Sequence, residues 1–385
     1  MLDGWDRQPQ KGAVSSAESV ERGEGDVVAP GAARAPAWES GNLDVVRSVA
    51  VLLVLVMHIR QACGWTYQGE AFHELGQAGV LLFFVHTSVV LMMSLERQQR
   101  SHFRMPYLVF VLRRAFRLLP LSVLVVAVVC VFRLPVADFK DAHLVGGNFN
   151  VRTVATNLLL IQNVTLDDSV LSTLWTLPYE IQMYLVLPLL FLIADRSRSL
   201  LPLLCAWGVS ALAFELLKGN PHSNLIMFAP CFVAGVICYR LLRQRRGNLP
   251  FALFAPALVL AIAGLQLKPG FHGWWAFCLG IGVLLSQFRE LGPGLLREGC
   301  RIIARYSYGI YLSHVLCMWL GFVVLAAEPS VVRWLAFALS ACLAPVVLYH
   351  AVEAPMIAVG SRLVRHWAAR AEPTPVGIYD KRPVS

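Results

Sequence analysis

Residues 43–58 read LDVVRSVAVLLVLVMH, an apolar segment with an arginine near its start and a histidine at its end. Continued to residue 62, this segment reaches the roughly 20 residues that an apolar helix needs to cross a bilayer. Similar apolar runs follow at 76–95, 110–132, 171–194, 199–217, 223–242, 251–267, 271–288, 303–326 and 332–355. The sequence therefore predicts an all-α, polytopic membrane protein with about ten transmembrane helices. The stretch 154–164 is too short to span, and we expect it to be re-entrant or interfacial.

The composition supports a lipid environment. Of the 385 residues, 57% are hydrophobic and only 15% are charged, whereas a soluble domain carries about 25% charged residues. The net charge of +9 comes from short basic clusters between apolar runs, a pattern typical of cytoplasmic loops and not of a nucleic-acid groove. The nine cysteines form no Cys-x-x-Cys pair and no zinc-type spacing with histidine. We interpret them as packing residues and predict no disulfide framework and no metal site.

The arginines indicate the orientation of the spans. Loops rich in basic residues alternate with loops that are poor in them, and the basic ones lie at 95–109, 195–198, 240–250, 289–305 and 362–370. By the positive-inside rule this alternation predicts that both termini are cytoplasmic in a multi-pass protein of the cell membrane. Residues 1–42 are rich in Gly, Ala, Ser, Glu and Pro and predict a disordered cytoplasmic tail. A transmembrane domain at 43–360 and a second cytoplasmic tail at 361–385 complete the predicted organisation.

Ionisable residues inside the spans are candidates for function, because they are costly in a bilayer. Arg47 and His58 are eleven residues apart in the first span. On a helix this separation is a rise of about 16 Å, with both side chains within about 20° of one face. A cation near the cytoplasm and a deeper imidazole would therefore share a face. The alternative is a snorkelling arginine and a histidine in the outer interfacial layer.

The third span opens with RRAFRLLP, in which Arg114 and Arg117 are three residues apart and share a helix face. Together with Arg47 at the same cytoplasmic level, the pair suits phosphate oxygens, which arginine forks bind well. A nucleotide-bearing donor would approach from this side. The alternative is ordinary positive-inside charge, which we prefer for Arg113.

The fourth span opens with LWTLPYEIQMYLVLP, where Glu180 follows Trp175 and Pro178 and lies one turn before Tyr184. A carboxylate and a proline at a helix start predict a cavity, because the freed backbone groups need protein or water around them. The depth predicted for Glu180 matches that of His58, so the carboxylate is a candidate to orient the imidazole. The alternative is a protonated or loop-exposed glutamate. Hydrogen bonding between helices, or pairing with the arginines, accounts for the remaining polar groups, His86, His314, His350 and Glu353.

Taken in order, these segments resemble the integral-membrane acyltransferase family 3, whose best-studied members O-acylate bacterial surface carbohydrates. The first span is similar to the family's opening helix, with an arginine, ten intervening residues and a histidine. RAFR resembles its Arg-x-x-Arg pair, LWTLPYE its Trp-x-Leu-x-x-Glu segment, SYGIYLSH its Ser-Tyr-x-x-Tyr-Leu-x-His segment and VEAP its final Glu-x-Pro. One segment departs from the pattern. After Phe-Phe-Val the family usually has one residue and then Ser-Gly, whereas this chain has His86, Thr87 and Ser88, so the backbone packing there is expected to differ.

The resemblance implies a membrane-bound O-acyltransferase of the class that moves groups other than aminoacyl groups. It implies acyl-CoA as the co-substrate, with acetyl-CoA expected, no permanently bound cofactor, and a carbohydrate or lipid-linked sugar as the acceptor. It further implies that His58 is the catalytic histidine, that Glu180 lies in the active site, and that the donor is bound by Arg47, Arg114 and Arg117. Supporting candidates are Trp175, Tyr184, His314 and Glu353.

Other classes of function remain open on the sequence alone. A transporter or flippase of a polar small molecule or lipid-linked sugar also places His, Glu and Arg within spans, but the inverted repeats that such folds often show are not found here. A non-catalytic membrane sensor or assembly subunit would need no histidine aligned with an arginine. If the protein is an acyltransferase, a glycosylated secondary metabolite is the alternative acceptor.

Overall fold

The computed structural model describes residues 40–65, 74–100, 105–134, 137–139, 142–144, 149–244 and 247–371. The predicted N-terminal tail lies outside these ranges except at its end, because the first helix already begins at Gly41. The last helix continues to Ala371, so the first part of the predicted C-terminal tail is helical. The rest of that tail lies outside the described residues.

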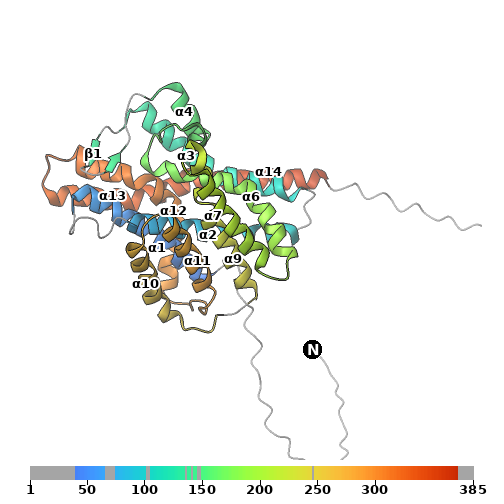
Figure 1. The fold of residues 1–385 in the computed structure, drawn as a ribbon. Helices are drawn as coiled ribbons and strands as arrows, with labels where there is room; N and C mark the ends of the chain where they lie inside the picture. Colours follow the sequence, from blue (N-terminus) through green and yellow to red (C-terminus); the bar gives the residue numbers. More distant parts are fainter. Residues whose placement is uncertain are drawn as a thin grey trace, which may run out of the picture. The chain divides into compact units, whose positions relative to one another are not determined.

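The described elements are helical apart from one short antiparallel hairpin, in which Ala137–Phe139 (β1) pairs with Ala142–Leu144 (β2). Figure 1 shows their order by colour. The first half of the chain contains α1 (Gly41–Cys63), α2 (Glu74–Arg100), α3 (Pro106–Val131), α4 (Val151–Leu158), α5 (Gln162–Thr165), η1 (Ser172–Thr176) and α6 (Leu177–Arg196). The second half contains α7 (Leu201–Leu217), η2 (Pro221–Ser223), α8 (Asn224–Met227), α9 (Ala229–Gln244), η3 (Phe251–Leu253), α10 (Phe254–Leu267), α11 (Phe271–Leu285), α12 (Leu295–Trp319), η4 (Leu320–Val324), α13 (Ser330–Leu348), η5 (Tyr349–Glu353) and α14 (Ala354–Ala371).

Each of the ten apolar runs predicted to span coincides with a helical segment. Within the described chain, seven of these segments are long and apolar enough to cross a bilayer. The other three are shorter apolar helices, Leu201–Leu217, Phe251–Leu267 and Phe271–Leu285. The stretch 154–164, which was predicted not to span, falls in the short helices α4 and α5. The all-helical membrane class is therefore confirmed, and the crossing of the three shorter helices stays a prediction.

Helices on the lipid side expose apolar side chains that a soluble protein would bury. Leu212 on α7, Leu260 on α10 and Leu343 on α13 are 58%, 71% and 61% exposed. Apolar side chains so exposed on three helices suit a bilayer, which is their natural solvent. The protein is thus a multi-pass membrane protein.

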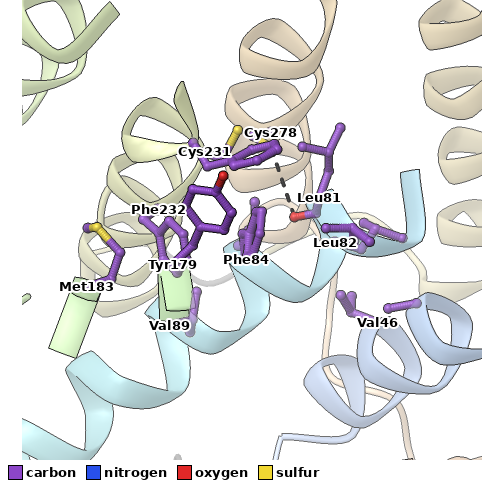
Figure 2. Packing of buried hydrophobic residues seen from close by; sticks show 14 of the residues in the cluster. Val46, Leu81, Leu82, Phe84, Val89, Tyr179, Met183, Cys231, Phe232 and Cys278 are labelled. Carbon is purple, nitrogen blue, oxygen red and sulfur yellow. Dashed lines mark hydrogen bonds between the residues drawn. The ribbon is translucent and has the colours of Figure 1, made fainter. Parts of the chain in front are cut away.

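The centre of the fold is built on α2, which packs against α1, α9 and α11. Figure 2 shows Phe84 of α2 beside Phe232 of α9, with ring centroids 4.6 Å apart. The thiol of Cys278 on α11 donates to the carbonyl oxygen of Leu81, 3.9 Å away. This cysteine is buried, in line with the packing role predicted for the cysteines.

The close approach of α2 and α9 depends on a glycine of α9. A Cβ atom at Gly235 would lie 2.6 Å from the carbonyl oxygen of Val85 and would also meet Ser88. Gly235 therefore permits the close contact of the two helices at the level of Ser88. The difference in backbone packing expected at His86, Thr87 and Ser88 stays a prediction.

The start of α1 is fixed to the segment before α12, about 250 residues away in the chain. The Ser40 hydroxyl accepts a hydrogen bond from Leu43 N as the N-cap and donates to Glu290. The Asn42 side chain donates to the carbonyl of Arg289 and accepts from Leu291 N, at 3.1 and 2.9 Å. These bonds set the register of α1 against α12, the two helices that carry the site described next.

Candidate functional site

A polar cavity lies among α1, α2, α3, α6 and α12. Its cavity volume is about 70 Å³, room for a few water molecules, so the walls must move apart to admit a larger ligand. Three predicted donor-binding residues and one predicted catalytic residue line it together. The polar side chains around it are Arg47, His86, Thr87, Arg114, Arg117, Thr176, Glu180, Tyr184, Ser307, Tyr308 and Tyr311.

Arg47 is held in the cavity by α12. Its Nε donates to the Ser307 hydroxyl, and that hydroxyl donates to the Ala304 carbonyl at 2.8 Å. The charges that act most strongly on Arg47 are those of Arg117, Glu180 and Glu353. The three arginines predicted to bind a donor therefore belong to one electrostatic group, with acidic side chains beside it.

Glu180 belongs to this arginine group. Its Oε1 accepts a hydrogen bond of 2.6 Å from the Tyr184 hydroxyl, and its charge acts on Arg47 and Arg114. Glu353, which is only 2% exposed, lies within electrostatic reach of Arg117 and Arg47. Both carboxylates offset part of the repulsion between the arginines.

His58 lies beside another predicted residue, His314. The ring centroids are 4.9 Å apart and the ring planes meet at 65°. Each Nδ1 atom faces a carbonyl of its own helix, Val54 O at 2.9 Å for His58 and Ile310 O at 3.0 Å for His314. Because a carbonyl only accepts, this geometry assigns the proton of each neutral ring to Nδ1 and leaves a lone pair on each Nε2. In the described part of the chain, the buried Nε2 of His314 has no hydrogen-bond partner.

A wall of side chains separates the cavity from the two histidines. Tyr311 lines the cavity, and its ring centroid is 6.2 Å from that of His314. Its hydroxyl shares a hydrogen bond of 2.8 Å with Thr176 of η1, and its ring meets Phe83 edge-on at 5.8 Å. Neither His58 nor His314 is among the described residues that line the cavity. Tyr311 thus stands between the arginine group and the histidine pair.

The segment 307–314 connects the site to several helices. Besides the contacts of Ser307, Tyr311 and His314, the Tyr308 hydroxyl donates to Leu118 O of α3 at 2.8 Å, and a Cβ at Gly309 would meet Pro345 of α13 at 3.0 Å. Of these residues only His314 was predicted as a site residue. The i, i+4, i+7 spacing of Ser307, Tyr311 and His314 places these three on one helix face and is the signal that could have identified the other two.

Two further residues, Trp175 and His86, lie at or near the cavity. Trp175 packs against Phe228, with centroids 5.7 Å apart, and so supports the start of α6 from the core. His86 was interpreted as a helix-bonding residue. It lines the cavity, is 3% exposed, and its Nδ1 has no hydrogen-bond partner among the described residues.

Comparison with known proteins gave one match. Residues 40–350 match a family model described as an acyltransferase domain. This range contains the whole cavity wall and both histidines of the pair, and it ends before Glu353. No curated protein matches the chain, and no solved structure matches it.

Proposed function

The chain belongs to acyltransferase family 3, whose domain model covers residues 40–350, and from that premise we propose that it moves an acyl group from a coenzyme A thioester to a hydroxyl group of a carbohydrate-type acceptor. The group moved is acetyl, the acceptor is a cell-surface polysaccharide or lipid-linked sugar, and the protein acts in the cell membrane. The observation that carries the proposal is the arginine cavity one side chain away from a pair of histidines.

The donor occupies the arginine cavity. Arg47, Arg114 and Arg117 line one space, and guanidinium groups bind phosphate oxygens through paired hydrogen bonds. Ser307 holds Arg47 in place, and the charge of Glu180 acts on Arg47 and Arg114. The pantetheine arm then extends from the phosphates toward Tyr311. When Tyr311 moves away from Thr176, a path opens through which the thioester reaches His58.

His58 acts as the general base. Its Nε2 lone pair takes the proton of the acceptor hydroxyl while the oxygen attacks the thioester carbonyl. The C–S bond breaks, and the imidazolium returns the proton to the departing thiolate of coenzyme A. Glu180 was predicted to fix the tautomer of His58. In this mechanism the Val54 carbonyl performs that task, since it already accepts from Nδ1, and Glu180 acts on the donor side.

The test is acyl transfer by the purified, detergent-solubilised protein. Labelled acetyl-CoA and a crude envelope-carbohydrate fraction are supplied to the wild type, to His58→Ala and to a control, His272→Ala, whose imidazole is 66% exposed and pairs with Glu215 at 3.1 Å. Loss of a general base lowers the rate by about 10²–10⁴-fold, so His58→Ala loses transfer while it still binds acetyl-CoA. The control keeps wild-type rates.

Two results would reject the proposal in different ways. Transfer by His58→Ala at near the wild-type rate removes His58 as the base. If the wild type neither binds nor consumes acyl-CoA of several chain lengths, the donor assignment fails, and a transporter or flippase becomes the better explanation of the polar cavity.

A further inference from the structure

A groove with apolar walls lies between α3 and the two helices α12 and α13. Its cavity volume is about 520 Å³, which is within the usual range for sites that hold organic ligands. Leucine and valine side chains form most of its walls, and none of the described lining residues is charged. The two serines of the lining donate their hydroxyls to carbonyls of their own helices. This space, which we call the apolar groove, therefore suits a hydrocarbon chain.

One end of the apolar groove leads to an arginine of α13. Arg333 and Ala344, which lines the groove, are eleven residues apart on this helix, so they share a face and lie about 16 Å apart along its axis. The Arg333 guanidinium lies over the Phe322 ring, 5.8 Å from its centroid, and donates to the Phe322 carbonyl at 3.4 Å. Its buried Nε has no hydrogen-bond partner among the described residues.

A second arginine stands at the same end of the groove. Arg133 follows α3 and is exposed, and it directly precedes Leu134, which lines the groove. Within the described part of the chain, neither Arg133 nor Arg333 forms a salt bridge. Arg133 lies sixteen residues after Arg117, a rise of roughly 24 Å on a helix. The two arginines are thus at the end of the bundle opposite to the arginine cavity.

Two tryptophans mark the depth of this end in the membrane. Trp334 stacks on Trp65, which follows α1, with ring centroids 6.2 Å apart, and the two residues are 36% and 60% exposed. Exposed tryptophans gather at the level of the lipid headgroups. Arg333, the neighbour of Trp334, therefore lies at the depth of a lipid phosphate whose chain occupies the apolar groove.

We propose that the apolar groove binds the acceptor, and that this acceptor is a lipid carrying a phosphate-linked sugar. The hydrocarbon chain lies in the groove, and Arg133 and Arg333 bind the phosphate or diphosphate, whose oxygens suit guanidinium groups. The inference rests on the proposed function and narrows its acceptor to a lipid-linked sugar instead of a finished polysaccharide.

The position of Arg333 brings such a sugar within reach of His58. Arg333 is close enough to Cys63, at the end of α1, for its charge to act on the thiol. Cys63 follows His58 by five residues, which is a rise of about 7.5 Å. A sugar joined to a phosphate at Arg333 therefore has a short distance to cover before a hydroxyl meets the base. A membrane phospholipid would fill the groove but bring no sugar to His58.

The first test measures binding of three probes to the detergent-solubilised protein: a long polyprenyl diphosphate, the polyprenol of the same length, and phosphatidylglycerol. The wild type is compared with Arg133→Gln/Arg333→Gln and with the control Arg152→Gln, whose side chain is 66% exposed and pairs with Asp167 at 3.2 Å. Loss of two charge-assisted contacts weakens binding of the diphosphate by at least about tenfold, to the level of the polyprenol. The control binds all three probes as the wild type does.

A second pair of variants tests the groove itself. Ala344→Phe fills the space and weakens binding of both the polyprenyl diphosphate and the polyprenol by about tenfold or more. The matched control is Leu339→Phe on the same helix, which is 60% exposed and outside the lining, and it keeps wild-type affinity. Equal effects of the two substitutions overturn the assignment of the chain to the groove.

The wild type alone also decides the question, whether or not the variants fold. Equal affinity for the polyprenyl diphosphate and the polyprenol overturns the inference, and so does phosphatidylglycerol that binds as tightly as the diphosphate. In the transfer assay, acetyl label is expected in the solvent-extractable lipids of the envelope fraction. Label found only in water-soluble polysaccharide overturns the inference and leaves the proposed function standing. A protein that binds the diphosphate but neither binds nor consumes acetyl-CoA rejects the proposed function and keeps the lipid site.

Discussion

His58 and His314 present two imidazole rings whose Nε2 atoms both carry a lone pair, with ring centroids 4.9 Å apart. When His58 takes a proton from the acceptor, the neighbouring neutral ring offers a lone pair to the new imidazolium. His314 is therefore a positioning residue that favours the charged form of the base during the reaction.

We expect His314→Asn to lower kcat by about 10–100-fold, at the low end of a general-base contribution, with the KM for acetyl-CoA nearly unchanged because the arginine cavity is intact. Steady-state kinetics with the His272→Asn control measures this. A change confined to KM would show that His314 serves the donor site instead.

Ser307 tests the donor side of the site. Its hydroxyl accepts the hydrogen bond of Arg47 Nε, and hydrogen bonds to charged groups contribute about 1.5–3 kcal/mol. Ser307→Ala is therefore expected to raise the KM for acetyl-CoA by about tenfold with little change in kcat. The matched control is Ser313→Ala on the same helix, whose hydroxyl donates to the Gly309 carbonyl one turn earlier and lies outside the arginine cavity. Equal effects of the two substitutions would indicate a general loss of α12 packing.

Single side chains also show what the sequence revealed and what it did not. Arg47, Arg114, Arg117 and Glu180 were predicted as site residues from their cost in a membrane, and they line one cavity. Ser307 and Tyr311 were missed because a neutral hydroxyl in a helix costs little free energy in a membrane. Such residues are therefore not recognisable as functional from their placement in a span. The pairing of His58 with His314 was also missed. It depends on the packing of α1 against α12, and the hydropathy of a helix does not tell which other helix it packs against.

Among pairs of helices, α2 and α9 give the sharpest prediction about stability. The Cβ of Gly235→Ala would lie 2.6 Å from Val85 O, so the helices must move apart, and overpacking of this kind costs about 1–3 kcal/mol. The control Gly208→Ala on α7 has no atom within 4 Å of the new Cβ and keeps or slightly raises stability. Thermal unfolding in detergent measures both, and an unchanged Tm for Gly235→Ala would contradict the packing described here.

Hydropathy predicted where each helix runs, because transfer into lipid depends on composition over about 20 residues. It did not predict η1, which brings Thr176 to Tyr311. That short element is positioned by buried amides: the Gln162 side chain donates to Leu174 O at 3.2 Å, and the Asn157 side chain accepts from Val170 N at 2.9 Å. Such contacts depend on tertiary structure and leave no periodic pattern in the sequence.

For the whole molecule, the number of crossings fixes where the termini lie. Among the described residues, seven helices are long enough to cross and three apolar helices are shorter. If the three also cross, the total is even and both termini lie on the cytoplasmic side, as the arginine pattern predicts. If they do not, the total is odd and the termini lie on opposite sides.

Reporter fusions at the two termini decide between these arrangements. We expect a fluorescent protein that folds only in the cytoplasm to be fluorescent at either end of the chain, and alkaline phosphatase to be inactive at both. Active phosphatase at one terminus alone would mean that an odd number of helices crosses. The predicted orientation would then be wrong for part of the chain.

The contact of Tyr311 with Thr176 has a consequence for the cell as well as for the reaction. The membrane potential does work of about 2.3 kcal/mol on each charge that crosses per 100 mV, so an unbroken file of water from the arginines to the opposite face would conduct protons and drain stored energy. A hydrogen-bonded tyrosine that closes the polar cavity before the histidines interrupts such a file. The protein can in this way keep several charged side chains within the membrane domain while the membrane around it remains an electrical insulator.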